Sequence, residues 1–373
     1  MTTRVLVVDD ASIFRRIISE ALACIPGVEV VGTAANGKLA VARLAELKPD
    51  LITLDIEMPE MNGLEVLKAI RDLACDTSVI MLSSRTVRGG EMTIRALEAG
   101  AFDFITKPEE GSPQKNLAHL RDSLLPMIQA LHRRREIRSI LKVKTPNLSA
   151  PAASKPRSLS HGSDPMKPPE LMKARSRSAP PIVLIGVSTG GPTALADLLP
   201  AFPPKIGAPV FIVQHMPPMF TEALAKRLQT KCAVTVKEAQ DGEIAQNDWV
   251  YLAPGGRHMK LSPGKGTEII IRITDDPPEN ACRPSVDFLF RSVASHFPGR
   301  SIAVVLTGMG NDGTEGMRLL KRGGAFTLAQ DEASCVVFGM PKEAILAGVV
   351  DAVVPLSKMA ASIIRNISEA SND

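Results

Sequence analysis

The sequence predicts an α/β protein built from two doubly wound parallel-sheet domains that a flexible linker joins. Two observations carry this prediction. Short apolar runs alternate with segments of helical periodicity, first in the N-terminal third of the chain and again in its C-terminal half. A long stretch without periodicity separates the two alternations. We therefore expect a first domain over residues 1–130, a linker over 131–180 and a second domain over 181–373.

The first domain contains five apolar runs of strand length, at residues 5–8, 28–31, 51–54, 79–82 and 102–105. Segments with helical spacing of apolar residues separate these runs, for example at 13–22, 39–47 and 63–70. Strands that alternate with helices along a chain form parallel sheets whose two faces are both covered. We therefore expect a five-stranded parallel sheet.

The stretch between the domains is basic and rich in Pro, Ser, Ala and Lys. Residues 142–180 contain few large apolar side chains, so they cannot bury a core of their own, and we expect a disordered linker. Much of the formal charge excess of +4 lies between Arg133 and Arg177. The charge therefore does not describe a basic face on a folded domain, and nucleic acid is not an expected partner.

The second domain repeats the alternation, with expected strands at 182–187, 210–214, 235–237, 249–252 and 302–307. Even the longest apolar runs, such as 302–306, have the length of strands and are too short to cross a bilayer. We expect a soluble cytoplasmic protein without membrane insertion.

The cysteines are odd in number and lack paired short spacing: Cys24, Cys75, Cys232, Cys282 and Cys335. This pattern argues against a disulfide framework and against a zinc site, so we expect reduced cysteines that are mostly buried.

Acidic residues follow two strands of the first domain. Asp9 and Asp10 come after the first strand and Asp55 after the third, and the carboxyl ends of parallel strands meet at one crevice. Three converging carboxylates repel one another unless a hard cation neutralises them, which predicts a Mg²⁺ site. Ser83 and Lys107 end the fourth and fifth strands and add a hydroxyl and a cation to the same edge.

These residues stand in motifs that resemble a response-regulator receiver domain of the flavodoxin-like fold. The motifs are Val7-Val8-Asp9-Asp10, the run 54–63, Ser83 and Lys107-Pro108, and the likeness covers roughly residues 3–125. The resemblance implies that Asp55 accepts a phosphoryl group from a histidine kinase while a metal and a lysine stabilise the charge. It also implies further roles: Mg²⁺ ligands at Asp9, Asp10 and Asp55 with the Glu57 backbone, phosphoryl contacts from Ser83 and Lys107, and an aromatic switch at Phe104.

In the second domain, the segment Gly186-Val187-Ser188-Thr189-Gly190 follows an apolar strand and precedes a helix-like segment. This spacing places Ser188 on a sharp strand-to-helix turn, where hydrolases keep a nucleophile and where the helix directs free N–H groups at an oxyanion. Such a glycine-rich turn also binds phosphates in α/β proteins, so the motif by itself leaves both readings open.

A serine nucleophile needs a base, and His215 is the best candidate because it ends the apolar strand 210–214 on the same edge as Ser188. The alternative for His215 is a histidine that only packs at a strand end. His258 is expected in a loop that lines the site, and His296 in a helix as a surface or packing residue.

The acid that orients the base is expected at Asp312, because the strand 302–306 runs into a glycine-rich turn that carries this residue to the same edge. The competing carboxylates are Asp287, Asp331 and the pair Asp275-Asp276. The chain order Ser188, His215, Asp312 differs from that of α/β-hydrolases, so a different fold with the same triad chemistry is expected.

The segments around these residues resemble the catalytic domain of the bacterial chemotaxis protein-glutamate methylesterases, which double as protein-glutamine glutaminases. The likeness runs from about 181 to 354 and includes the motifs at 185–192, 213–216, 252–256, 283–287, 306–313 and 338–341. It implies a Rossmann-like fold and hydrolysis of glutamyl methyl esters on the cytoplasmic helices of chemoreceptors, with deamidation of some glutamines. Ser188 would be the nucleophile, His215 the base and Asp312 the orienting acid, with no cofactor for this reaction. Thr189 and the Met309 backbone would line the oxyanion pocket.

Cys282 departs from the histidine that some relatives have at this position, so we place it in the substrate pocket as a residue that alters substrate positioning. A thiol nucleophile at Cys282 is an alternative, but no dedicated base is evident in the sequence. Two other classes of function remain: a DNA-binding output domain, for which no helix-turn-helix unit is evident, and a binding module without catalysis. A methylesterase for a signalling array other than chemotaxis is also compatible with the sequence.

The joining of a receiver to a hydrolase predicts regulation. We expect the unphosphorylated receiver to cover the Ser188 edge, and phosphorylation of Asp55 to shift the population toward an open arrangement.

Overall fold

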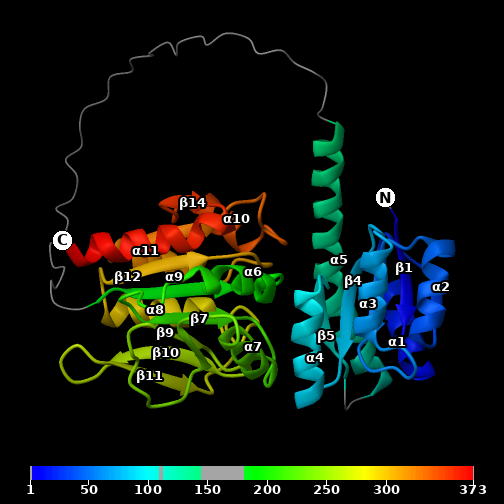
Figure 1. Cartoon of the computed structure of the whole chain (residues 1–373), viewed down its shortest axis with the longest axis horizontal. Coiled ribbons are helices and arrows are strands. Elements are labelled where there is room, and N and C mark those ends of the chain that lie inside the picture. The colour runs from blue at the N-terminus through cyan, green and yellow to red at the C-terminus, as the bar shows by residue number, and fades with distance from the viewer. Residues whose placement is uncertain (1, 109–111, 144–179, 373) are drawn as a thin grey trace, which may run out of the picture.

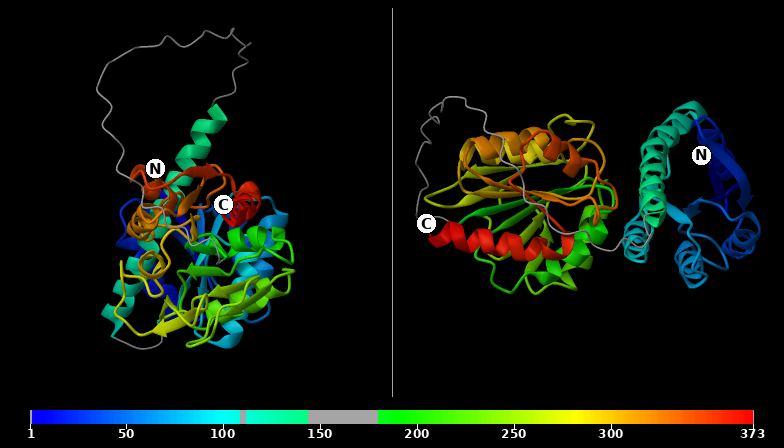
Figure 2. Two further views of the ribbon diagram at one scale, coloured as in Figure 1. Left: turned by 90° about the vertical axis from the view of Figure 1, so that its left-hand side faces the viewer. Right: turned by 90° about the horizontal axis from the view of Figure 1, so that it is seen from above.

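The computed structural model describes residues 2–108, 112–143 and 180–372 (Figure 1). Two α/β bodies lie side by side (Figure 1 and the right view of Figure 2). We call the body with strands β1–β5 the N-terminal domain and the body with strands β6–β14 the C-terminal domain.

The N-terminal domain has a five-stranded sheet of order β2-β1-β3-β4-β5, and every neighbouring pair is parallel. Its strands are β1 (Thr3–Val8), β2 (Val28–Ala34), β3 (Leu51–Asp55), β4 (Ser78–Ser83) and β5 (Asp103–Thr106). Its helices are α1 (Ser12–Ala23), α2 (Gly37–Leu47), α3 (Gly63–Asp72), α4 (Val87–Glu98) and α5 (Pro113–Val143). The five predicted strands and the doubly wound parallel fold are confirmed.

Helix α5 continues through residues 131–143, where the sequence predicts linker. The segment is helical because Arg, Leu, Glu, Ile and Lys favour helix and the next proline comes only at Pro146, and its assignment to the linker stays a prediction. The remainder of the expected linker, residues 144–179, lies outside the described residues.

The C-terminal domain has a seven-stranded parallel sheet of order β14-β13-β12-β6-β7-β9-β8. Its strands are β6 (Ile182–Val187), β7 (Val210–Gln214), β8 (Thr235–Glu238), β9 (Trp249–Leu252), β12 (Ser301–Val305), β13 (Phe326–Gln330) and β14 (Ala352–Val354). The sequence predicted the five strands in the middle and on one side, and did not predict β13 and β14. The antiparallel hairpin of β10 (His258–Pro263) and β11 (Ile269–Thr274) is a further element that it did not predict.

The central strand β6 is apolar throughout because helices cover both faces of the sheet. Helices α6 (Gly191–Leu198), α7 (Phe220–Gln229) and α11 (Leu356–Asn372) contribute to the core on one face. Helices α8 (Val286–His296), α9 (Thr314–Arg322) and α10 (Met340–Leu346) and the hairpin contribute to the core on the other face. A 3-10 turn, η1 (Leu199–Ala201), extends α6. The chain leaves β6 toward β7 on one side and reaches β12 on the other, so the edge beside β6 is a topological switch point.

The two domains meet where α4 packs on α7 (Figure 1). The rings of Phe104 in β5 and Phe220 in α7 stack with their centroids 4.6 Å apart. Glu98 at the end of α4 pairs with Arg227 at 2.9 Å and with Lys231 at 2.8 Å. Buried side chains of both domains belong to one continuous apolar cluster through this contact.

Within the described ranges, no helix combines the length and the apolar character that a membrane span requires.

Candidate active site

Ser188 lies directly after β6, on the turn that leads into α6. Its N–H donates to the Thr307 carbonyl at 3.0 Å, and its own carbonyl accepts from the Gly191 N–H at 2.8 Å. Gly190 adopts φ 77°, a conformation that disfavours any residue with a side chain. The glycines therefore make the sharp turn that leaves Ser188 half-buried at the carboxyl edge of the sheet.

The loop after β12 packs directly against Ser188. A Cβ on Gly308 would lie 2.7 Å from the Ser188 Cβ, so the close approach of these two segments requires glycine. Met309 follows Gly308 in this loop, and the Thr307 hydroxyl donates to the Thr189 carbonyl at 2.9 Å. The two residues expected to line an oxyanion pocket, Thr189 and Met309, therefore lie in the segments on either side of this contact.

His215 directly follows β7, the strand next to β6. The backbone N–H of His215 donates to the Val187 carbonyl at 3.1 Å. The Gln214 side-chain amide donates to the carbonyls of Ser188 at 3.0 Å and His215 at 3.1 Å, and so fixes the two strand ends relative to each other. The Ser188 hydroxyl makes no hydrogen bond with His215 within the described residues.

Asp312 lies in the loop between β12 and α9, and its Oδ2 is 2.8 Å from His215 Nε2. Its carboxylate accepts from the backbone N–H groups of Val286 at 2.7 Å and Asp287 at 3.1 Å. The Ser285 hydroxyl donates to it at 2.9 Å and the Asn280 amide at 3.0 Å.

Asp312 is 3% exposed. Burial alone would raise its pKa, but the hydrogen bonds and the His215 ring hold the pKa well below its usual range. Asp312 is therefore an anion with a fixed position, and it holds His215 with Nε2 protonated and the ring in one orientation.

The Asp312 carboxylate raises the pKa of the His215 ring. Burial alone would lower the pKa of His215, but the hydrogen bond with Asp312 and the contact with Cys282 raise it to about 9. Neutral imidazole, the form that accepts a proton, therefore becomes the major form only at alkaline pH in this arrangement.

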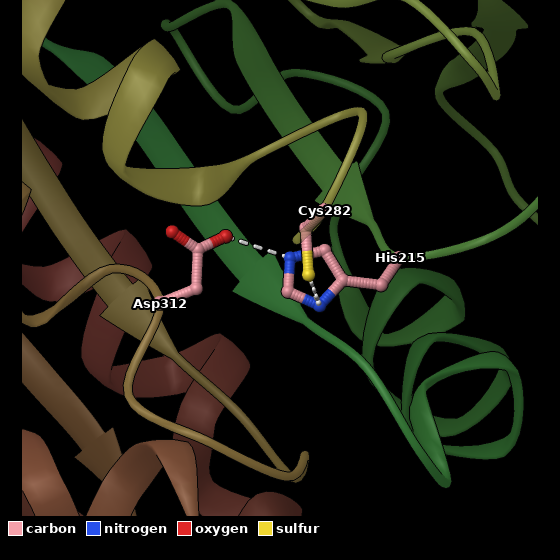
Figure 3. Close-up of side chains that lie close together, drawn as sticks. All are labelled: His215, Cys282 and Asp312. Atoms are coloured by element: carbon pink, nitrogen blue, oxygen red, sulfur yellow. Dashed lines mark hydrogen bonds and ion pairs between the residues drawn. The ribbon is translucent and has the colours of Figure 1, made fainter. Parts of the chain in front are cut away.

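Cys282 Sγ lies 3.6 Å from His215 Nδ1, the ring nitrogen that Asp312 does not hold (Figure 3). Figure 3 shows the thiol and the carboxylate at different nitrogens of the same ring. The sequence placed Cys282 in the pocket but gave it no base. The structure brings a base into contact with it, because the loop that precedes α8 folds over the end of β7.

The other two histidines of this domain have different surroundings. His258 is fully buried, stacks on Phe288 at 4.3 Å, accepts from the Ser285 N–H at 3.3 Å and contacts the Pro277 carbonyl at 3.1 Å. Burial lowers the pKa of His258, so it serves as a neutral support for the loop around Ser285 and does not line the site as expected. His296 is exposed at the end of α8, as expected.

The competing carboxylates do not contact His215 in the part of the chain that the structure describes. Asp287 accepts from the Gly316 N–H at 2.6 Å and from Asn280 at 3.0 Å, and burial raises its pKa to about 6. Asp275 pairs with Arg257 at 2.9 Å, and Asp331 binds Ser334. Asp312 is the acid that reaches the candidate base.

In the N-terminal domain, the predicted acidic cluster is present at the carboxyl edge of the sheet. Carboxylate oxygens of Asp9, Asp10 and Asp55 lie within 4.8 Å of one another. Lys107 Nζ pairs with Asp9 and with Asp55, each at 2.7 Å. Burial raises the pKa of Asp9, and that of Asp55 to about 6, despite the pairing with Lys107. One lysine cannot neutralise three carboxylates, and Asp10 is exposed to solvent. The cluster therefore fits a divalent cation that takes oxygen ligands.

Ser83 and Phe104, expected to contact the phosphoryl group and to act as the aromatic switch, lie at the end of β4 and in the neighbouring strand β5. Ser83 is fully buried, accepts from the Thr93 hydroxyl at 2.8 Å and donates to the Gly89 carbonyl at 3.3 Å. Phe104 is directed at the C-terminal domain, where it stacks on Phe220.

Several supporting residues were not found from the sequence. Asn280 and Ser285 hold Asp312, and Gln214 joins the ends of β6 and β7. Asp103 at the start of β5 hydrogen-bonds the Thr189 side chain across the domain contact. Gln214 beside His215 was the available signal, since an amide at the end of an apolar strand is expensive to bury without partners.

Comparison with known proteins identifies both domains. Residues 5–118 match the family model of the response regulator receiver domain, and residues 183–363 match that of CheB methylesterase. The solved CheB methylesterase catalytic domain of Thermotoga maritima is 42% identical with a TM-score of 0.50, covering 50% of this chain and 99% of that chain.

Two relatives named "Protein-glutamate methylesterase/protein-glutamine glutaminase" extend over the chain as a whole. The one from Desulfotalea psychrophila is 48% identical and the alignment covers 98% of both chains. The one from Trichodesmium erythraeum is 43% identical, covering 98% of this chain and 99% of the relative. This protein therefore belongs to the protein-glutamate methylesterase/protein-glutamine glutaminase family, carboxylic ester hydrolases of chemotaxis that carry a receiver domain.

Proposed function

We propose that the protein hydrolyses glutamyl methyl esters, and deamidates specific glutamines, on the cytoplasmic helices of methyl-accepting chemoreceptors. The reaction releases methanol in the cytoplasm and drives adaptation in chemotaxis. The observation that carries the proposal is the 2.8 Å contact between His215 and Asp312, beside the turn that carries Ser188. The relatives named for this activity support the choice of substrate class.

In the proposed mechanism, Ser188 Oγ attacks the ester carbonyl while His215 takes the hydroxyl proton. Nδ1 is the nitrogen that accepts it, because Nε2 faces Asp312. A rotation that brings the Ser188 hydroxyl to Nδ1 is part of the proposal, since such contacts tighten in the substrate complex. The tetrahedral intermediate expels methanol, which takes the proton from His215. Water then attacks the acyl-serine by the same route and releases the glutamate; for a glutamine, ammonia leaves in place of methanol.

Thr189 and the Met309 backbone are proposed to line the pocket for the developing oxyanion. Their segments flank Ser188, so both lie beside the carbon that the Ser188 hydroxyl would attack. Asp312 stabilises the imidazolium that forms during each step.

The N-terminal domain is proposed to accept a phosphoryl group on Asp55 from a histidine kinase. Asp9, Asp10 and Asp55 would hold the Mg²⁺ that receiver domains require, and the ion would neutralise charge on the transferring group. Lys107, which already contacts two of these carboxylates, and Ser83 are the proposed phosphoryl contacts.

The domain contact supports an inhibitory role for the unphosphorylated receiver. Met309, from the loop beside Ser188, packs on the apolar cluster of the N-terminal domain, and the Thr189 side chain hydrogen-bonds Asp103. Residues on both sides of Ser188 therefore touch the receiver. A bulky helical substrate could not reach the proposed nucleophile without separation of the domains, which we propose phosphorylation promotes.

The function is tested by methanol release from methylated receptor membranes, measured with and without a small phosphodonor and Mg²⁺. We expect the phosphodonor to raise the rate of the wild type, by roughly 5- to 150-fold if the coupling has the usual size. Asp55→Asn should retain the basal rate and lose the increase, because its amide cannot be phosphorylated. Equal stimulation of both proteins would exclude Asp55 as the switch, and the absence of methanol under every condition would exclude the substrate.

Asp103 predicts a pH dependence of the inhibition. Burial at the domain contact raises its pKa to about 6, although hydrogen bonds from Thr189 and the Phe104 N–H act in the opposite direction. In an open arrangement, the pKa of the Asp103 carboxyl would return toward 3.8. The closed arrangement thus binds the Asp103 proton more tightly than the open one. Protonation favours closing, and this contribution is lost as the pH rises through about 6.

We therefore expect Asp103→Asn, which stays neutral, to have a lower basal rate than the wild type at neutral pH. The two basal rates should converge at acid pH, and their ratio, measured between about pH 5 and 8, cancels the pH dependence of catalysis itself. A constant ratio would show that burial of this carboxylate does not contribute to opening.

A further inference from the structure

The contact between His215 and Cys282 places a nitrogen and a sulfur ligand together at the edge of the sheet. We propose that His215 Nδ1 and Cys282 Sγ form a binding site for Zn²⁺ and similar thiophilic divalent cations, and that occupation of this site reversibly stops the esterase. The binding half of the proposal stands on geometry alone, whereas the inhibition half rests on the proposed catalytic role of His215.

The separation of the two atoms has the value that one zinc ion requires. Zinc bonds of about 2.3 Å to sulfur and 2.0–2.1 Å to nitrogen, at a tetrahedral angle, place the two ligand atoms about 3.6 Å apart. His215 Nδ1 and Cys282 Sγ are 3.6 Å apart without any movement (Figure 3).

Asp312 prepares the ring for a metal. It accepts from Nε2, so the lone pair of the neutral His215 ring lies on Nδ1, on the side of Cys282. Histidines that bind metals usually donate their other N–H to a carboxylate in this manner. Asp312 therefore positions the ring from the Nε2 side and stays outside the coordination of the cation. Water would complete the coordination.

The chemistry of the donors separates this site from the receiver site. The described residues contain two groups of three potential metal ligands. Asp9, Asp10 and Asp55 offer oxygen only, which suits Mg²⁺, whereas the second group offers sulfur and imidazole, which select Zn²⁺ and related ions over Mg²⁺. The spacing of the cysteines in the sequence gives no sign of this site because its two ligands are 67 positions apart.

Occupation of the site removes the proposed base. At neutral pH the cation replaces two protons, one on the Cys282 thiol and one on His215 Nδ1, and both go to solvent. It then holds the Nδ1 lone pair that would accept the Ser188 proton. Cys282 is half-buried, and so is His215, so a hydrated ion can reach both. No covalent bond of the chain changes, and a chelator should restore the enzyme.

Binding is measured on the full-length protein with Co²⁺ as the probe, in excess Mg²⁺ so that the receiver carboxylates are occupied. We expect one Co²⁺ per chain with a thiolate-to-cobalt charge-transfer band in the near ultraviolet. Cys282→Ser should lose the band, while Cys232→Ser, the matched change at another half-buried cysteine, should keep it. Persistence of the band in Cys282→Ser, or its absence from the wild type, would overturn the proposed site.

Inhibition is measured as methanol release against free Zn²⁺ set by a metal buffer, with each variant compared to its own metal-free rate. Cys282→Ser should need at least about 10-fold more Zn²⁺ for half inhibition, as expected for loss of a ligand. Cys282→His, which supplies another imidazole, should restore sensitivity to Zn²⁺ without the charge-transfer band. Identical inhibition curves for the wild type and Cys282→Ser would refute the inhibition.

The two measurements separate failure of this site from failure of the proposed function. A cobalt band that depends on Cys282, in a protein that never releases methanol, would support the metal site and reject the substrate. Methanol release that Zn²⁺ leaves unchanged would support the substrate and reject the inhibition.

Discussion

Ser188→Ala is expected to abolish methanol release, with a loss of kcat on the order of 10⁶-fold, as when a serine hydrolase loses its nucleophile. The hydroxyl is the only group on the turn between β6 and α6 that we propose to attack the ester. Alanine fits the same turn, because the conformation depends on Gly190 and on backbone hydrogen bonds. The Ser188→Ala variant should still be phosphorylated at Asp55, because Ser188 and the turn around it are not part of the receiver site.

The matched control is Ser295→Ala, the same chemical change at an exposed position of α8. It should keep the wild-type rate, and both variants should keep the wild-type melting temperature. Substantial activity in Ser188→Ala would point to the thiol that touches His215. Loss of that residual activity on adding Cys282→Ala would then identify Cys282 as the nucleophile and refute our assignment.

Asp312→Asn is expected to lower kcat by roughly 10⁴-fold with little change in KM, the loss known for this change in a serine protease triad. The Asp312 carboxylate accepts from five donors, His215 among them. An amide has one oxygen and one NH₂ group, so at least one of those donors would face another donor. The His215 ring would lose both its fixed tautomer and the anion that stabilises its charged form.

A second readout distinguishes this role from a merely structural one. Without the carboxylate, the pKa of His215 should fall from about 9 toward its ordinary 6.5, so the residual activity should reach its plateau at lower pH. Asp287→Asn is the matched control, because Asp287 lies beside Asp312 and does not contact His215 among the described residues. A similar loss in both variants, with no shift of the pH profile, would contradict the proposed role of Asp312.

The sequence predicted those features that depend on a strand and the residue that follows it. Ser188 and His215 each come directly after an apolar strand, so their place at the carboxyl edge followed from the parallel sheet. Asp312 could be chosen because the glycines around it predict a tight turn after β12. The acidic cluster of the receiver was predicted by the same reasoning.

Features that depend on how loops fold over the sheet were not predicted. The contact of Cys282 with His215 and the support of Asp312 by Asn280 and Ser285 join segments distant in sequence. No periodicity or spacing encodes such contacts, because they arise only when the packed domain brings the loops together. The stacking of Phe104 on Phe220 is another example, because the sequence around each residue predicts only that its ring lies in the core of its own domain.

Under the proposed inhibition by the receiver, that aromatic contact would make the basal rate of the enzyme depend on temperature. Phe220 is fully buried and Phe104 is 9% exposed, so separation of the domains would expose apolar surface to water. Exposure of apolar surface to water carries a positive heat-capacity change. The hydrophobic attraction between the two domains therefore weakens on cooling. On that proposal, the N-terminal domain would be held less tightly over the Ser188 edge in the cold, and the rate without phosphorylation would be a larger fraction of the stimulated rate.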